Sequence, residues 1–218
     1  MTRLYLIRHG ATTLNQEAPY RLQGRLLDPP LAPLGRQQAL RAANQLAQRP
    51  IAAVYASPLL RSRETAALVA APHRLEPVVV PDLIEADLGR WEGLTWEQAR
   101  ALDPEYHDRF LAHPGTVPYP GGESFFDVQV RVTPVLAGLA AEHPDAEITV
   151  VGHNVLNRAY LAGLLGLPID RARPLRQANG GINVIEFEGA EARVVTLNAA
   201  FHLDGLGPEG RKSLRRHP

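Results

Sequence analysis

Two histidines in this sequence stand directly after segments that are expected to be buried strands. Arg8 and His9 follow the apolar run 4–7, and His153 follows a second such segment at 147–152. Continuous apolar runs of this length are typical of parallel strands that are covered on both faces. Ligands of open α/β sheets bind outside the carboxyl ends of the strands. We therefore expect Arg8, His9 and His153 to reach one edge of a sheet, where they could bind an anion.

Two further residues could complete this site. Arg61 follows the expected strand 51–56, near the start of a helix, and Glu85 follows the expected strand segment 76–83. Two histidines, two arginines and one carboxylate suit phosphoryl transfer, because a neutral imidazole is a nucleophile and guanidinium groups stabilise charged phosphoryl oxygens. The carboxylate could transfer a proton to the leaving oxygen.

Each of these residues also has a purely structural explanation. Arg61 could be a solvated helix residue that pairs with Glu64 or Thr65. Glu85 could be an ordinary loop carboxylate, and His153 could be a hydrogen-bonded residue of the core. The residues by themselves leave these alternatives open.

The elements that would position these residues alternate between strands and helices. This alternation predicts an α/β fold, and we expect a three-layer α/β/α sandwich with a mostly parallel sheet and an antiparallel edge strand. Ser57 is expected to cap a helix that has Pro58 at its first position. Besides the strands above, we expect a hairpin of strands 182–187 and 192–197, and helices at 35–48, 58–71, from 125 onward and from 154 to about 165.

Residues 89–120 differ in composition from the rest of the chain. They contain a concentration of aromatic residues between prolines and glycines, and we interpret them as a cap inserted over the edge of the sheet. The aromatic rings could line the wall of a pocket or could only pack the cap. We expect one domain over 1–204 and a flexible tail at 205–218. The aromatic residues are Trp91, Trp96, Tyr106, Phe110 and Tyr119.

The overall composition excludes several kinds of site. The 218 residues contain no cysteine, so disulfides, thiolate metal sites and a cysteine nucleophile are absent. The 23 basic and 23 acidic residues balance, so nothing in the total charge favours a nucleic-acid or membrane partner. No apolar run approaches the ~20 residues of a membrane span. We expect a soluble cytoplasmic protein, and we expect a homodimer because this is the commonest oligomer.

Taken together, the motifs of this sequence resemble those of the histidine phosphatase superfamily, which is also called phosphoglycerate mutase-like. They occur in the order typical of the family and span residues 4 to 190, and their combination is specific although each piece alone is weak. Thr12 and Asn15 belong to the first motif. The motifs are LIRHG at 6–10, RLQG at 21–24, LAPLG at 31–35, ASPLLRSRETA at 56–66, LIE at 83–85, GRWEG at 89–93, PGGES at 120–124 and VGH at 151–153.

The resemblance implies a role for each candidate residue. His9 would attack phosphorus and form a phosphohistidine, and Glu85 would protonate the leaving oxygen and later activate water. No metal and no other cofactor would be required, because arginines supply the positive charge. The phosphoryl oxygens would be held by Arg8, Arg61 and His153 with help from Asn15, and Gln23, Gly24 and Asn154 would lie at the substrate.

Within this family, three functions compete. The chain could be a phosphomonoesterase, a phosphoglycerate mutase, or a non-catalytic phosphate-binding module. The residues Gln23, Gly24 and Arg25 and the segment 89–93 resemble the cofactor-independent phosphatase branch, and the arginine pair and tyrosine motif of the mutase cap are not found. We therefore predict a phosphatase for a small metabolite of the phosphosugar, phosphoglycerate or α-ribazole phosphate type.

At one position the sequence departs from the family pattern. The family often has glycine after the second histidine, and here the residue is Asn154. Asparagine tolerates positive φ better than most residues, so we expect that a strained turn could be kept. Its amide could also contact the substrate.

Overall fold

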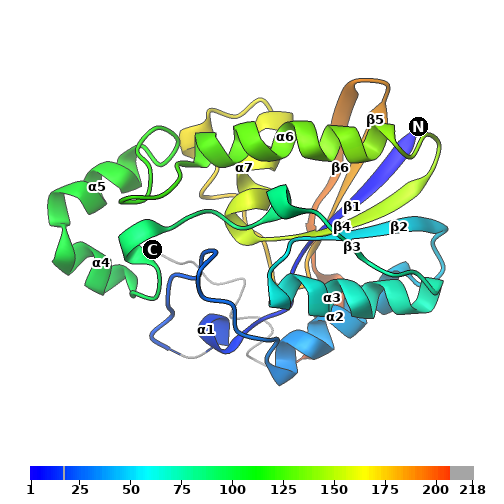
Figure 1. The fold of residues 1–218 in the computed structure, drawn as a ribbon, viewed down its shortest axis with the longest axis horizontal. Helices are drawn as coiled ribbons and strands as arrows, with labels where there is room; N and C mark the ends of the chain where they lie inside the picture. Colours follow the sequence, from blue (N-terminus) through cyan, green and yellow to red (C-terminus); the bar gives the residue numbers. More distant parts are fainter. Residues whose placement is uncertain (17, 207–218) are drawn as a thin grey trace.

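The computed structural model describes residues 1–16 and 18–206, and its centre is a six-stranded sheet (Figure 1). The strand order is β3-β2-β4-β1-β5-β6. The first four strands of this order run parallel, whereas β5 runs antiparallel to β1 and to β6. The mostly parallel sheet is confirmed, and the strand that reverses direction, β5, lies one place in from the edge strand β6. The strands are β1 (Thr2–Arg8), β2 (Ile51–Ala56), β3 (Val78–Val79), β4 (Glu147–Gly152), β5 (Ile182–Glu188) and β6 (Glu191–Ala199).

Helices cover both faces of this sheet, which confirms the three-layer sandwich. Alternate residues of a strand point to opposite faces, and on β1 Leu4 and Leu6 pack in one hydrophobic cluster while Tyr5 and Ile7 pack in another. The first cluster includes side chains of α6 and α7, and the second those of α2 and α3, so the two helix pairs lie on opposite sides in Figure 1. The helices are α1 (Thr13–Gln16), α2 (Pro33–Leu46), α3 (Leu60–Ala70), α4 (Trp96–Leu102), α5 (Pro104–Ala112), α6 (Phe125–Ala141) and α7 (Asn154–Leu164), with 3₁₀ turns at Ala71–His73, Pro81–Leu83, Gly89–Trp91, Ile169–Arg171 and Phe201–Leu203.

The segment 89–120 forms the projecting end of the molecule, with α4 and α5 at the left of Figure 1. Trp91 lies fully buried at its centre, and the rings of four aromatic neighbours stand 5.2–6.1 Å from it in T-shaped contacts. Edge-to-face contacts at this distance are the geometry that aromatic pairs prefer. Trp91 and Phe110 therefore pack the cap and do not line a pocket. The domain limits of 1–204 stay a prediction, and most of the expected tail, residues 207–218, lies outside the described residues.

The start of α3 differs from the expectation. The N-cap position is held by Leu59, not by Ser57, and Pro58 lies outside the helix. The cap is supplied instead by a residue distant in sequence, because both carboxylate oxygens of Asp28 accept from the backbone N–H of Leu60 at 2.8 Å. A carboxylate at a helix N-terminus is favourable through its hydrogen bonds and the helix dipole.

The third strand is also shorter than expected. Of the predicted segment 76–83, only β3 pairs with the sheet, and Pro81–Leu83 forms a 3₁₀ turn. Pro77 directly precedes the two paired residues, and Pro81 follows after Val80, whose N–H still donates to the carbonyl oxygen of Ala56 at 2.9 Å. Proline has no N–H for the sheet ladder, so pairing cannot extend across either position.

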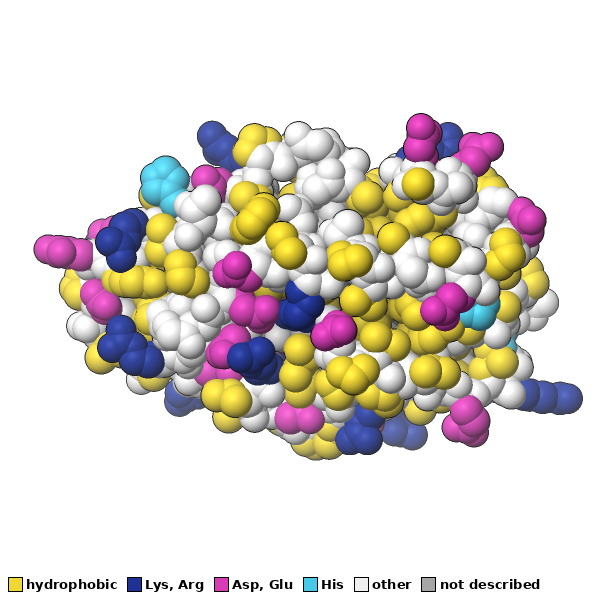
Figure 2. Space-filling view, turned by 45° about the horizontal axis from the view of Figure 1, so that its top comes forward, with side chains coloured by type: hydrophobic (Ala, Val, Ile, Leu, Met, Phe, Trp, Pro, Cys, Tyr) yellow, Lys and Arg dark blue, Asp and Glu magenta, His cyan; other side chains and the backbone are white. Residues whose placement is uncertain are grey.

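The outer surface carries charges of both signs. On the face drawn in Figure 2, acidic and basic side chains are interspersed among apolar ones, in agreement with the balanced composition. Over the described part of the chain, no helix is both long and apolar enough to cross a membrane.

A close contact between two backbone segments fixes the loop that follows β1. A Cβ built on Gly35, in α2, would lie 1.9 Å from the carbonyl oxygen of Ala11, and one built on Gly10 would lie 2.2 Å from the carbonyl oxygen of Gly35. Only glycine lets backbones approach so closely. The loop that carries His9 is therefore packed directly against the start of α2.

We expect Gly35→Ala to destabilise the protein and Gly138→Ala to stabilise it, although both glycines are in helices. At Gly35 the added methyl group forces two backbones apart, at a cost of about 1–3 kcal/mol. At Gly138, in the exposed face of α6, no atom lies within 4 Å of the added Cβ, and alanine favours a helix by about 0.5–1 kcal/mol. Thermal unfolding of both variants measures this difference, and equal Tm values would contradict the close contact.

Candidate active site

His9 follows the carboxyl end of β1 and is almost completely buried. Its Nδ1 lies 2.7 Å from the backbone oxygen of Gly10. A carbonyl oxygen can only accept a hydrogen bond, so Nδ1 must carry the proton and Nε2 has the free lone pair. This tautomer makes Nε2 the atom that can act as a nucleophile.

His153 occupies the corresponding place after β4, at the N-cap of α7. Its ring centroid is 5.2 Å from that of His9. The ring is fully buried, and neither of its nitrogens has a hydrogen-bond partner among the described residues. The alternative of a hydrogen-bonded core histidine is therefore wrong, and a buried ring of this kind can bind a ligand oxygen.

Arg61 is fully buried in the first turn of α3, with 0% of its side chain exposed. Its Nη2 donates to the carbonyl oxygen of Gly24 at 2.8 Å and its Nη1 to that of Leu27 at 3.1 Å, and Asp28 is 3.4 Å from Nη1. Its Nε has no partner among the described residues. The alternative of a solvated helix residue is wrong, because the guanidinium group is held inside the protein while its Nε is left for a ligand.

Arg8, the last residue of β1, is held in a similar way. Its Nη1 donates to the carbonyl oxygen of Gln177 at 2.7 Å, and its Nε is buried without a partner in the described part of the chain. Arg8, Arg61 and His153 thus each present an unpaired nitrogen near His9. Buried donors that lack partners are costly unless a ligand satisfies them, so this group is suited to an anion with several oxygens.

The charges of this site keep both histidines neutral. Burial, together with the positive charges of Arg61 and Arg8, holds the pKa of His9 and that of His153 well below the ordinary value. Burial also lowers the pKa of Arg8 to about 9, so this guanidinium remains charged at neutral pH. Among the described residues, no group of three or more His, Asp or Glu side chains is placed to hold a metal ion. The positive charge at the site comes from arginine.

Glu85 is buried and holds the start of α7. Its Oε2 accepts from the backbone N–H groups of Asn154 and Val155, at 3.0 and 3.1 Å, and its Oε1 from those of Leu156 and Ala86, at 3.1 and 3.0 Å. Each oxygen of a carboxylate has two acceptor positions, and here all are used. Glu85 is therefore not an ordinary loop carboxylate, and to donate a proton it must give up one of these bonds.

Three of the predicted residues contact the site through other residues. Asn15 and Gln23 are joined by a 3.3 Å hydrogen bond, and Asn15 Oδ1 also accepts from the backbone N–H of Thr12 at 3.1 Å. Gly24 holds Arg61 through its carbonyl oxygen. These contacts fix the loop that follows His9, and they place Asn15, Gln23 and Gly24 as supports of the charged residues.

The structure adds two polar residues that sequence reasoning missed. Asn179 donates to the backbone oxygen of His9 at 3.0 Å and to Asn15 Oδ1 at 3.3 Å, and Gln177 holds Arg8. Both precede β5, whose amino end meets the carboxyl end of β1 because the two strands are antiparallel. The signal available in the sequence was the polar residue types of Gln177 and Asn179 directly before an expected strand of the hairpin.

Asn154 begins α7 and does not adopt the expected left-handed conformation. The non-glycine residues with positive φ in the described chain are Arg74, Asp145 and Asn198. The expectation of a strained turn is wrong because the N-cap residue, His153, already has extended geometry and the helix starts at Asn154. The side-chain oxygen of Asn154 is buried without a partner among the described residues, so it remains available to a ligand.

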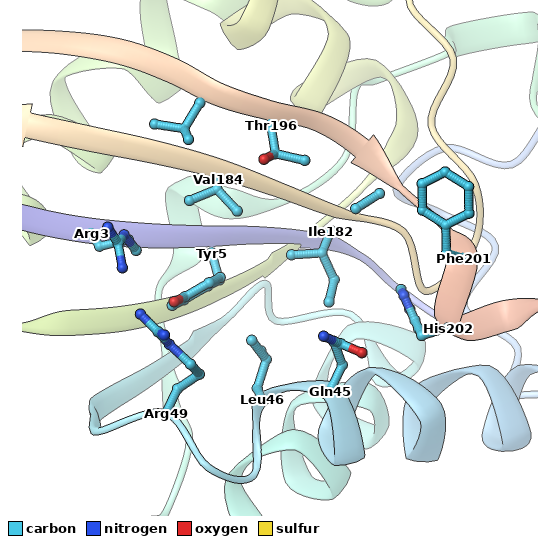
Figure 3. Close-up of a pocket in the computed structure, with 12 residues that line it drawn as sticks. Arg3, Tyr5, Gln45, Leu46, Arg49, Ile182, Val184, Thr196, Phe201 and His202 are labelled. Carbon is cyan, nitrogen blue, oxygen red and sulfur yellow. The ribbon is translucent and has the colours of Figure 1, made fainter.

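A cavity of about 370 Å³ lies elsewhere in the molecule, between the sheet and α2 (Figure 3). Arg3 and Tyr5, from the first half of β1, line one end of it, and Phe201 and His202 lie at the other (Figure 3). His9 follows the opposite end of β1. The cavity is therefore separate from the site that the histidines and arginines form.

Comparisons with known proteins agree with the geometry of this site. The model of the histidine phosphatase superfamily (branch 1) matches residues 4–200. Phosphoserine phosphatase 1 of Hydrogenobacter thermophilus is 32% identical over 98% of this chain and 100% of its own length. A metal-independent phosphoserine phosphatase of Arabidopsis thaliana is 31% identical over 95% of this chain and 85% of its own.

A solved structure, that of Bacillus stearothermophilus YhfR, superposes with a TM-score of 0.85 at 32% identity, covering 93% of this chain and 99% of that one. The family match spans more than nine-tenths of the described residues and includes each motif on which the resemblance was based. With its paired histidines and buried arginines at the carboxyl edge of a mostly parallel sheet, the chain belongs to branch 1 of the histidine phosphatase superfamily and is a phosphoric monoester hydrolase.

Proposed function

We propose that the chain hydrolyses a small phosphomonoester through a phosphohistidine formed on His9, without a metal ion. The observation that carries this proposal is the arrangement at His9: Nε2 is unprotonated, the unpaired ring of His153 lies 5.2 Å away between ring centres, and the charges of Arg8 and Arg61, each with an unpaired Nε, act on His9. Phosphoryl transfer depends mainly on position and on stabilising the charge of the phosphoryl oxygens. The buried arginines would do here what a divalent cation does in other phosphatases.

In the first step, His9 Nε2 attacks phosphorus as the bond from phosphorus to the ester oxygen breaks. The guanidinium groups of Arg8 and Arg61 bind the phosphoryl oxygens, and neutral His153 donates a further hydrogen bond. The departing oxygen takes a proton from Glu85, which leaves an alcohol and a carboxylate.

In the second step, water attacks the phosphohistidine. Glu85, now a carboxylate, accepts a proton from the water as its oxygen bonds to phosphorus, and the bond from phosphorus to Nε2 breaks. Inorganic phosphate leaves and His9 returns to its neutral form. Glu85 thus serves as acid and then as base, and the site returns to its starting state.

The relatives suggest the size of the substrate. Both curated relatives described above are named phosphoserine phosphatases, and phosphoserine belongs with phosphosugars, phosphoglycerate and α-ribazole phosphate in the range of small esters that this site could take. A cytoplasmic location, a homodimer and the absence of nucleic-acid and membrane partners stay predictions.

The function is tested by phosphate release from a panel of small phosphomonoesters in excess EDTA, with His9→Ala as the control. We expect release by the wild type and at least a thousandfold slower release by the variant, because nucleophile removal leaves only binding and charge stabilisation. The same samples are assayed for isomerisation of 3-phosphoglycerate with and without 2,3-bisphosphoglycerate. Isomerisation faster than release would identify a mutase, and neither reaction would indicate a binding module.

The role of Glu85 is tested by Glu85→Gln with esters of different leaving groups. We expect kcat/KM to fall by about 10²–10⁴ for alkyl phosphates and much less for p-nitrophenyl phosphate, because a nitrophenolate leaves without a proton. Since Glu85 also holds the start of α7, the variant's Tm is measured in parallel. Equal losses of kcat/KM on both substrates would show that Glu85 is not the acid and acts only as a helix cap.

The protonation state of His9 is tested by NMR of the ¹³C-labelled imidazoles, assigned by comparison with His9→Ala. We expect His9 to stay neutral at about pH 5.5, below the ordinary histidine pKa of about 6.5, because burial and two arginines lower its pKa. Between about pH 6.5 and 5.5, the His9 imidazole takes up a proton in the unfolded chain but not in the folded chain. The free energy of unfolding should therefore fall as the pH drops below about 6.5. A midpoint near 6.5 for His9 would contradict this environment.

A further inference from the structure

We infer that Arg158 binds a carboxylate of the substrate, so that the enzyme prefers phosphomonoesters with a carboxylate a few bonds from the ester oxygen. This inference rests on the phosphatase activity proposed above and adds a specificity-determining residue to the same site. Arg158 belongs to none of the motifs that identify the family in this sequence.

The position of Arg158 on α7 directs it toward the active site. It lies four residues, about one helical turn, after Asn154, the first residue of the helix. Side chains of a helix point toward its N-terminus and cover the preceding turn. The guanidinium group of Arg158 is therefore directed toward the N-terminal end of α7, where His153 is the N-cap and Glu85 accepts the backbone hydrogen bonds.

One short segment holds Arg158 and Arg8 side by side. The Nε of Arg158 donates to the carbonyl oxygen of Leu175 at 2.8 Å, and the Nη1 of Arg8 donates to that of Gln177 at 2.7 Å. Two residues of chain span at most about 7 Å. A phosphate bound by Arg8 and an anion bound by Arg158 would accordingly be close neighbours, as they are in a short phosphorylated acid.

Arg158 forms no ion pair in the described part of the chain, and the carboxylate whose charge acts on it is that of Glu85. All acceptor positions of Glu85 are taken by backbone N–H groups, so this carboxylate does not hydrogen-bond Arg158. Arg158 and Arg8 also repel one another, which contributes to the low pKa of Arg8, and burial lowers the pKa of Arg158 to about 10. Two neighbouring, half-buried cations that share one carboxylate are unfavourable unless a further anion accompanies them, so a ligand with two negative groups is favoured.

Residues of the cap, segment 89–120, also lie close to Arg158. Tyr119 is buried within reach of the charges of Arg158 and Arg173, and burial raises the pKa of its phenol, so the hydroxyl keeps its proton and can donate it in a hydrogen bond. The guanidinium of Arg173 lies over the ring of Trp96, 5.2 Å from its centre. The planar guanidinium of Arg158 together with a neutral phenol is suited to a carboxylate, which accepts paired hydrogen bonds in one plane.

The test compares two esters that differ only in the carboxylate: O-phosphoserine and O-phosphoethanolamine. We expect wild-type kcat/KM to be at least tenfold higher for phosphoserine. In Arg158→Gln, this ratio should fall by about tenfold or more, because a charged hydrogen bond to the carboxylate is lost. Arg158→Lys keeps the positive charge but lacks the planar guanidinium group. In this variant the ratio of kcat/KM should lie between those of the wild type and Arg158→Gln. Arg171→Gln, at an exposed arginine nearby, is the matched control and should keep the wild-type ratio.

The outcomes separate this inference from the proposed function. Equal wild-type kcat/KM for the two esters, with release that depends on His9, would overturn the inference and leave the phosphatase intact. A parallel loss on both esters in Arg158→Gln would also overturn it, since Arg158 would then act only by holding the segment at Leu175. Absence of release that depends on His9 from every ester would overturn the proposed function and the inference with it.

Discussion

The parallel pairing of β1 with β4 is the constraint on which the active site depends. The register places Arg8 opposite Gly152, so the next residue of each strand, His9 and His153, emerges at the same level of the same edge. A shift of one residue would turn every side chain of β1 to the opposite face of the sheet, and both hydrophobic clusters would lose their contacts. The apolar residues that determine the packing of the strands therefore also determine the distance between the two histidines.

The site concentrates positive charge that the fold must hold in place. Arg61 is fixed by the backbone oxygens of Gly24 and Leu27 and, at 3.4 Å, by the carboxylate of Asp28, and Arg8 by a backbone oxygen before β5. Carbonyl oxygens orient a guanidinium group without neutralising it, and the Asp28 carboxylate is shared with the backbone N–H of Leu60. The arrangement is less stable than a paired one, and this is the usual cost of a site that is organised before its ligand arrives.

Glu85 links the active site to the start of helix α7. Its carboxylate accepts four backbone hydrogen bonds, three of them from the first turn of α7, and the same helix carries His153 at its N-cap and Arg158 one turn further on. A proton on Glu85 would weaken the hold on this turn. The contacts of Glu85, the start of α7 and the positions of His153 and Arg158 are therefore coupled through one side chain.

The sequence alone determined the strands and helices that have a regular pattern of apolar residues. It also determined which polar residues follow the ends of the strands. Strands β1, β2 and β4, the hairpin, and the residues His9, His153, Arg61 and Glu85 could be predicted because apolar runs and strand ends are local signals. What only the tertiary structure decided depends on contacts between distant segments. Asp28 caps α3, Asn179 and Gln177 contact His9 and Arg8 at the carboxyl end of β1, and Glu85 caps α7. Each of these contacts depends on how the strands pair and the helices pack, and a local sequence pattern does not contain this information.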